Sequence, residues 1–495
     1  MPQARATKTL DANDRRATEF GPVEEQSGRR PRARETPWRI FAGRILVCVV
    51  PPLIWFAPLN LEPRAKHALA ITSFMIIAWM TEAFAYALTG FIGCYLFWAL
   101  GIARFDIAFG GFATEAPWFC FGALLIGMMA TKTGLASRLA YQVITRVGST
   151  HSRLFLGFTL VSCLLTFLVP SGAARVVIMA AMALGLMQAV GHGPGTNFGK
   201  GIFIILTYTS GLFDKMFIAG SSTILARDLI EKHGHVKVLW SHWFIAFLPC
   251  TLVTIIVVWR LALLLFPPEK TAAAGETAYF EDELRSMGRL SKMEKRGALL
   301  MLMAICLWMT DFLHHISPAM IGLGTGLLAT LPRLGVLDSE DVRRVNYLPV
   351  FFVATAAGMG QVLVETKAID TLTGVMFAWM EPLLNVHTLA LTPFWTAITY
   401  HIFIGSNGAM LSTSLPPLMN FAAARGINVL ALGMIWTFAG GSKVFIYQSA
   451  LLIVGYSYGY FNGRDLFRFA LCMTLIESVM LLPLVSLYWP LIGLG

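Results

Sequence analysis

Long apolar stretches separated by short polar ones fill the chain from about residue 42 onwards. Most run for about 17 to 25 residues, the length that a helix needs to cross a hydrocarbon layer of ~30 Å. A polar segment, 267–296, divides the series into two halves. The predicted spans are 42–58, 67–81, 83–102, 112–131, the broken pair 154–170 and 171–190, 200–230, 240–266, 297–313, 317–332, 347–365, the broken pair 388–405 and 407–424, 429–461, and 466–492.

Small polar residues interrupt two of these stretches where a continuous membrane helix would carry leucine. The first interruption contains Ser171 and Gly172, and the second contains Ser406, Asn407 and Gly408. Hydrocarbon tolerates backbone groups without helical partners only where the backbone lines a protein cavity or an ion site. We therefore expect two re-entrant hairpins whose tips face each other across a transport site.

The two halves of the chain match each other. Three pairs of landmarks recur at an almost constant interval along the sequence: Lys132 with Thr366, Ser171 with Ser406, and Gly220 with Gly455. A constant interval marks an internal duplication. With hairpins at 154–190 and 388–424, each repeat crosses the membrane five times, so the second copy is upside down. The prediction is an all-α polytopic membrane protein with about 11 transmembrane helices plus two re-entrant hairpins in two inverted repeats.

Composition agrees with this class. The chain is 56% hydrophobic and 13% charged, whereas about a quarter of residues are charged in soluble domains. Its net charge of +10 does not indicate a nucleic-acid partner, because Lys and Arg gather in the first residues and in short loops, as topology signals do. The positive-inside rule then predicts a multi-pass inner-membrane protein with a cytoplasmic N-terminus and a C-terminus on the opposite side.

Changes in composition suggest where the chain divides. Charged residues spaced among apolar ones also predict helices in the membrane interface at 132–147 and 366–381. The expected divisions are a disordered cytoplasmic tail (1–38), a first transmembrane helix (39–61), repeat 1 (62–266), a cytoplasmic linker (267–296) and repeat 2 (297–495).

Each hairpin tip ends one half-helix and begins another. A helix N-terminus offers free N–H groups and a partial positive charge, which suit an anion. Ser171, Ser406 and Asn407 add side-chain donors, while carbonyls at the ends of the preceding half-helices suit a small cation. A simpler interpretation makes both serines ordinary N-caps at a kink. The duplication favours a paired site.

Ionisable residues inside apolar stretches are expensive and therefore candidates for function. We hypothesise that Arg175 helps to hold the anion; the alternative is a structural ion pair with Asp214. Asp214 is itself a candidate for carrying a coupling proton. Lys215 and Lys443 are likewise buried according to the sequence.

Other classes of protein fit less well. Asp311, His314 and His315 have a spacing that suits one helical face, but they fall at the expected outer end of a crossing, so no metal is predicted. An intramembrane hydrolase would need a base beside Ser406, and His401 would point away across the break. A channel is disfavoured because two opposed hairpins suit alternating access. We therefore predict no enzyme and no cofactor.

The residues resemble a known family. The segment Arg64–Gly101 is similar to the opening of the divalent anion/sodium symporter family, with WMTEAF at 79–84 beside that family's W-x-T-E-A-I-P. The sequence KTGLASRLA at 132–140 resembles its interfacial helix, and the broken pairs resemble its hairpins, whose tips each carry Ser-Asn-Thr. The resemblance covers about residues 62–495.

This resemblance implies a secondary transporter for di- or tricarboxylates or sulfate, usually coupled to sodium and homodimeric. It also implies an elevator motion, in which the hairpins with 200–266 and 429–495 move against a scaffold. The hairpin tips, the buried charges and the resemblance together predict substrate binding by Ser171, Gly172, Arg175, Ser221, Ser222, Ser406 and Asn407. They predict cation binding by Ser171, Asp214, Ser406, Asn407 and Gly408.

The chain also departs from the family pattern. Gly408 stands where the second tip should have Thr, Gly172 and Ala173 replace Asn and Thr at the first, and 221–223 reads Ser-Ser-Thr instead of Thr-Pro-Pro. The first sodium site is therefore altered. Na⁺ or H⁺ coupling and exchange of another organic anion, such as a sulfonate, all stay open.

Overall fold

The computed structural model describes residues 38–81, 83–148, 150–169, 171–269, 276–384, 388, 390–404 and 407–494. Across these ranges the chain is almost entirely helical and contains no strand, so the predicted all-α fold is confirmed. The predicted tail up to residue 37 lies outside the described residues, as do Pro170, Gly405 and Ser406.

The first half of the chain forms one set of helices after an initial helix, α2 (Trp38–Phe56), which packs along α3. The set comprises α3 (Pro63–Thr81), α4 (Tyr86–Ala99), α5 (Phe105–Ala108), η2 (Gly110–Ala113), α6 (Glu115–Lys132), α7 (Leu135–Val147), α8 (His151–Leu168), α9 (Gly172–Val190), α10 (Asn197–Leu212), η3 (Phe213–Lys215), α11 (Ser221–Gly234) and α12 (Trp240–Leu265).

The second half repeats this order after a separate helix, α13 (Glu276–Ser286). Its elements are α14 (Lys292–Met309), α15 (Asp311–His314), α16 (Pro318–Leu328), α17 (Ser339–Arg343), α18 (Leu348–Glu365), α19 (Ala368–Phe377), η4 (Ala378–Leu383), α20 (Leu391–Phe403), α21 (Asn407–Ala424), α22 (Val429–Gly440), η5 (Ile446–Gln448), α23 (Ala450–Ser457), α24 (Gly463–Pro483), the π-helical η6 (Leu484–Tyr488) and α25 (Trp489–Leu491).

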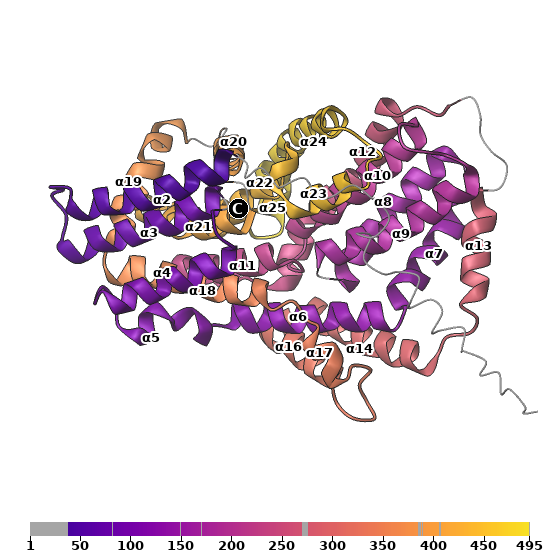
Figure 1. Ribbon diagram of the computed structural model, residues 1–495, viewed down its shortest axis with the longest axis horizontal. Coiled ribbons are helices and arrows are strands. Elements are labelled where there is room, and N and C mark those ends of the chain that lie inside the picture. Colours follow the sequence, from indigo (N-terminus) through magenta and orange to yellow (C-terminus); the bar gives the residue numbers. More distant parts are fainter. Residues whose placement is uncertain are drawn as a thin grey trace, which may run out of the picture.

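Helices of the first set pack against helices of the second set, and the contacts are reciprocal. Helix α6 packs along α16, and its counterpart α18 packs along α4. In the same way α11 packs on α21 while α23 packs on α9. Figure 1 shows α6 beside α16 along one edge, with α11 near the middle of the molecule. Such reciprocal contacts are what two repeats related by a pseudo-two-fold axis produce.

The spacing of the repeats is constant only in part. The second arms of the hairpins, α9 and α21, begin at Gly172 and Asn407, and this interval equals the one between Ser171 and Ser406, as predicted. Helices α10 and α22, however, end at Leu212 and Gly440, which lie closer together in the sequence, and Gly455 lies inside α23 rather than before it. The prediction that Gly220 and Gly455 are equivalent positions in the two repeats is therefore wrong. The reason is that the second repeat is shorter beyond its hairpin.

Several helices are long and apolar enough to cross a bilayer. Within the described residues these are α8, α9, α12, α18 and the run from α24 to α25. Helices α6 and α7 add a sixth if they count as one span, but they are bent by 65° at Gly134, whose φ of +75° turns the chain. Helix α7 therefore falls within residues 132–147, the segment for which an interfacial helix is predicted.

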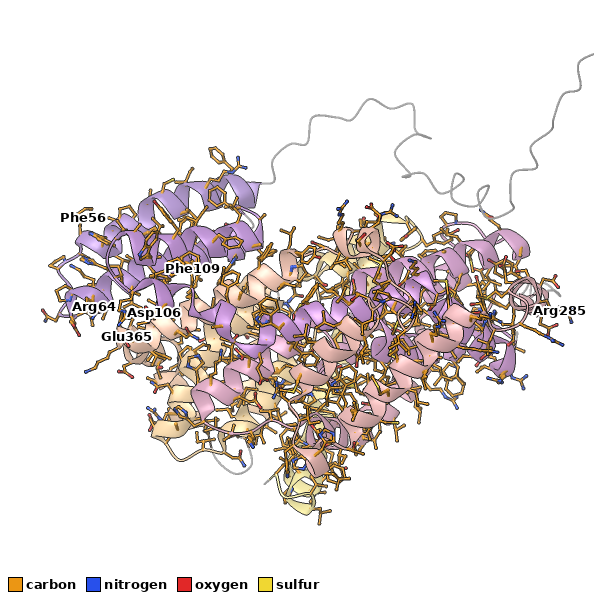
Figure 2. The ribbon with its side chains drawn as sticks, turned by 90° about the horizontal axis from the view of Figure 1, so that it is seen from below. Phe56, Arg64, Asp106, Phe109, Arg285 and Glu365 are labelled. Carbon is orange, nitrogen blue, oxygen red and sulfur yellow. The ribbon has the colours of Figure 1, made fainter. Side chains whose placement is uncertain are left out.

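The segment 267–296, expected to be a polar linker, contains α13. Phe280 of α13 is fully buried, and its ring lies 6.1 Å from that of Tyr141 on α7 and 6.4 Å from that of Phe158 on α8. Figure 2 labels Arg285 of α13 at the end of the molecule opposite Phe56 and Arg64. Apolar residues on one side of this helix therefore anchor the linker to α7 and α8.

A buried ion pair fixes the end of the linker. Nε of Arg138 donates to Oε1 of Glu294 at 2.5 Å, and its Nη1 donates to the carbonyl of Gly288 at 2.9 Å. Glu294 also completes a capping box with Ser291 at the start of α14. Burial raises the pKa of Glu294, but the hydrogen bonds from Arg138 and Ser291 outweigh it and hold the pKa below its usual 4.5.

We expect Glu294→Gln to destabilise the protein by about 3 kcal/mol at neutral pH, because Arg138 keeps a buried charge without its partner. A lowered carboxyl pKa stabilises the fold above pH 4.5, and this contribution is lost as pH falls through the lowered value. Thermal unfolding of the detergent-solubilised protein should therefore lose stability on acidification in the wild type, and less in the variant. Glu281→Gln, at an exposed ion pair, should match the wild type.

Candidate functional site

Four breaks in helices meet at one cavity of about 440 Å³. Two are the hairpin tips, and two are the gaps between α10 and α11 and between α22 and α23. The predicted residues that line this cavity are Ser171, Gly172, Asp214, Ser221, Ser222, Asn407 and Gly408. Ser406 lies outside the described residues. The structure thus brings together residues from both halves of the chain.

Four helices begin at the cavity: α9, α11, α21 and α23. The hydroxyl of Ser171 accepts from the N–H of Ala174, and that of Ser449 accepts from the N–H of Leu451, so both serines are N-caps. Helix α11 begins after Gly220 and has no side-chain cap. The four N-termini give the cavity a positive potential and free N–H donors, which suit an anion.

Arg175 lies behind the wall of this cavity. Its side chain is fully buried, with Nη2 donating to Oδ1 of Asp214 at 2.5 Å and Nη1 donating to the carbonyl of Val169 at 2.6 Å. Nη2 also donates to the carbonyl of Ser210. The expected direct contact with an anion is therefore not what this arrangement offers. It is the ion pair with Asp214 that the sequence left as the alternative.

The Arg175 guanidinium contacts carbonyls at the C-terminal ends of two helices. Val169 is the C-cap of α8, and Ser210 lies in the last turn of α10, so both carbonyls belong to helix C-termini. The sequence predicted a small cation at such carbonyls beside a tip. In the structure a side chain of the protein supplies positive charge there.

Lys443 was not among the predicted site residues, yet it lines the cavity. It lies three residues beyond the end of α22, and Lys215 lies three residues beyond the end of α10, so the two lysines are equivalent in the repeats. Only alignment of the helix ends makes this visible, because the two lysines lie closer together in the sequence than the two hairpin tips do.

The two lysines differ in their partners. Nζ of Lys215 lies 2.6 Å from Oε1 of Glu477 and 2.9 Å from the hydroxyl of Ser442. Nζ of Lys443 donates to the carbonyl of Gly211 at 3.4 Å, and no ion pair joins it to a carboxylate of the described residues. Lys443 therefore brings to the cavity wall a positive charge that no ion pair among the described residues balances.

At the second tip an acceptor is left without a donor. Oδ1 of Asn407 is buried and has no hydrogen-bond partner among the described residues. It points at the end of α22, where a Cβ added to Gly440 would lie 2.8 Å from it. An oxygen in this state fits a small cation, as predicted for this tip, or a donor group on a bound molecule.

The opposite wall comes from other helices. It includes Tyr86 at the start of α4, Cys120 and Leu124 on α6, and Asn346 before α18. Asn346 is exposed, and its Oδ1 accepts from the N–H of Leu348. The cavity therefore lies between the hairpin-bearing helices and the α4–α6–α18 group.

The residues weighed for other chemistry have their own partners. Asp311 is fully buried and accepts from the N–H of Trp240 at 2.7 Å, capping α12. Nε2 of His314 lies 2.9 Å from the carbonyl of Leu307. Nδ1 of His401 lies 3.2 Å from the carbonyl of Ser442.

Paired hairpin tips and discontinuous helices around a central cavity define a membrane transporter. The match to the description "sodium:sulfate symporter transmembrane region" spans residues 39–494, and the chain belongs to this family. The sequence resemblance is thereby confirmed, and the protein is a transporter rather than an enzyme.

Similar proteins carry the names of antiporters or of a membrane protein. A "citrate/succinate antiporter" of Escherichia coli K12 is 24% identical over 93% of this chain and 99% of its own length. An "L-tartrate/succinate antiporter" of the same strain is 26% identical over 78% and 80%. A "membrane protein" of Cupriavidus necator is 25% identical over 92% and 93%. The crystal structure of the Alcanivorax borkumensis YdaH transporter shares the fold, with TM-score 0.52, 18% identity and coverage of 92% and 98%.

Proposed function

We propose that the protein exchanges small di- or tricarboxylates across the membrane, with Arg175 and Lys443 as built-in cations in place of coupling sodium at the first tip. The observation that carries this proposal is the pair of side-chain cations at the helix breaks. The names of two relatives, both carboxylate antiporters, point the same way.

The balance of side-chain charges around the helix breaks favours exchange over transport of a single anion. Among the described residues at the breaks, two ion pairs, Arg175–Asp214 and Lys215–Glu477, balance the charges of four side chains. Lys443 remains, together with the partial charges of four helix N-termini. Uncompensated charge costs several kcal/mol inside a membrane. A carrier that has released its anion therefore returns slowly until it binds another.

The cavity provides groups for the carboxylates themselves. Backbone N–H groups at the starts of α9, α11 and α21 and the hydroxyls of Ser221 and Ser222 are donors, and Lys443 adds charge. Two carboxylates on one small molecule would use both tips at once. Such contacts also fit sulfate or a sulfonate.

Sodium symport is a second candidate, favoured by one observation. The orphaned Oδ1 of Asn407 at the second tip fits a sodium ligand. Asn407 with the neighbouring backbone would hold one such ion, and the ion would add positive charge for the anion. This candidate predicts that transport depends on sodium.

The hairpins with α10–α12 and α22–α24 would move as one body against the group containing α4, α6, α16 and α18, as in an elevator. The distribution of Lys and Arg supports an inner-membrane protein with the N-terminus in the cytoplasm and the C-terminus on the other side. The homodimer is proposed from the family resemblance alone.

Counterflow into proteoliposomes tests the substrate class. Vesicles are loaded with unlabelled succinate, citrate, tartrate, sulfate or an aromatic sulfonate, and uptake of labelled succinate is followed. We expect uptake with the carboxylates inside and background uptake with sulfate or the sulfonate. Preference for sulfate or the sulfonate, or no uptake with any anion, would refute the carboxylate proposal.

A further inference from the structure

An apolar groove of about 630 Å³ lies between α12 and α24, separate from the transport cavity. Its lining residues come from α12, α24 and η6. None of them is charged. Neither the transport cavity nor the proposed exchange uses any of them.

Prolines shape this groove. Pro249 within α12 has no N–H, so the carbonyl of Ile245 one turn earlier loses its helical donor. The hydroxyl of Tyr488 donates to this carbonyl at 3.0 Å, and Nε1 of Trp489 donates to the carbonyl of Ala246 at 3.1 Å. These two bonds clamp η6 and the start of α25 to α12 beside Pro249.

The clamp lies at the Tyr488 end of the groove, and other lining residues are exposed. Val253 of α12 and Leu475 and Val479 of α24 are 44%, 48% and 64% exposed, although they lie on helices long and apolar enough to span a membrane. The open side therefore faces hydrocarbon. The hydroxyl of Tyr488 is already engaged, so water in the groove would lack the two to four polar partners that it needs.

The dimensions of the groove match half of a bilayer. Its lining on the α24 side runs from Leu475 to Tyr488, which at a helical rise of ~1.5 Å per residue corresponds to about 20 Å. One leaflet of hydrocarbon is roughly 15 Å deep, half of the usual ~30 Å. One end of the lining carries Tyr488, a residue type enriched at the membrane–water interface. The groove thus runs from the interface into one leaflet.

We propose that this groove binds one acyl chain of a membrane phospholipid, held between α12 and α24 beneath Tyr488. The chain fills a space that protein side chains leave open. Burial of its methylene groups against an apolar lining is the favourable contribution. The polar headgroup would stay at the interface, beside the clamp between Tyr488 and Ile245.

Photo-crosslinking tests the site without reference to transport. The full chain is reconstituted into nanodiscs containing a phospholipid with a diazirine in its acyl chain, and adducts are mapped by peptide mass spectrometry. We expect adducts concentrated in residues 249–253 and 475–488. Val479→Trp, which puts an indole into the groove, should reduce them roughly tenfold.

Leu264→Trp is the matched control, because Leu264 is 77% exposed on the same α12 but outside the groove. It should leave the adducts unchanged. Size-exclusion elution checks that both variants fold. Labelling spread evenly over lipid-facing helices, or adducts in 475–488 that persist in a correctly folded Val479→Trp, would overturn the proposal. Because the readout is covalent labelling, failure here leaves the exchange proposal untouched.

Discussion

Lys443→Met is expected to lower carboxylate exchange roughly 10- to 150-fold, the range that about 1.5–3 kcal/mol for a hydrogen bond to a charged group implies. The substitution removes a cavity charge that no ion pair among the described residues balances, and it keeps an unbranched side chain of similar length. Labelled succinate counterflow at subsaturating concentration measures the effect. We expect Lys443→Arg to retain part of the activity, since it keeps the charge.

Lys200→Met provides the control for Lys443. Lys200 is a partly exposed lysine whose only ion pair in the described residues, with Asp465, spans 3.7 Å. It should exchange at the wild-type rate. Normal exchange by a folded Lys443→Met would remove this lysine from the account.

Arg175→Ala should abolish exchange, and an added cation should restore part of it. The variant leaves the carboxylate of Asp214 and the carbonyls of Val169 and Ser210 facing an unfilled space. Loss of a buried partner costs about 3–5 kcal/mol, so purified variant is first checked for monodispersity. Counterflow is then measured with and without guanidinium or sodium ions.

A double variant separates rescue at this site from a general salt effect. Arg175→Ala combined with Asp214→Asn keeps the carbonyls but removes the carboxylate, so sodium should no longer restore exchange. If folded Arg175→Ala exchanges at the wild-type rate with no added cation, Arg175 does not supply the charge that we assign to it.

Much of the architecture is readable in the sequence because breaks in apolar stretches are conspicuous. Small polar residues at 171–172 and 407–408 predicted helix starts, and α9 and α21 begin there. The same residues, with Ser221 and Ser222, line one cavity. Their roles as ligands remain predictions.

The rest depended on three-dimensional detail that spacing does not carry. The direction of the Arg175 side chain follows from two carbonyls at the ends of α8 and α10, helices separated by α9. The equivalence of Lys215 and Lys443 was hidden because the second repeat is shorter beyond its hairpin. The ion pair between Lys215 and Glu477, which belong to different halves of the chain, distinguishes the two lysines.

Efflux from proteoliposomes tests the central claim, exchange with built-in cations, most directly. Vesicles loaded with labelled succinate are diluted into choline or sodium medium, each with and without external succinate. We predict fast efflux only with external succinate, at equal rates in both media. Fast efflux without external anion, or efflux that requires sodium, would contradict the account.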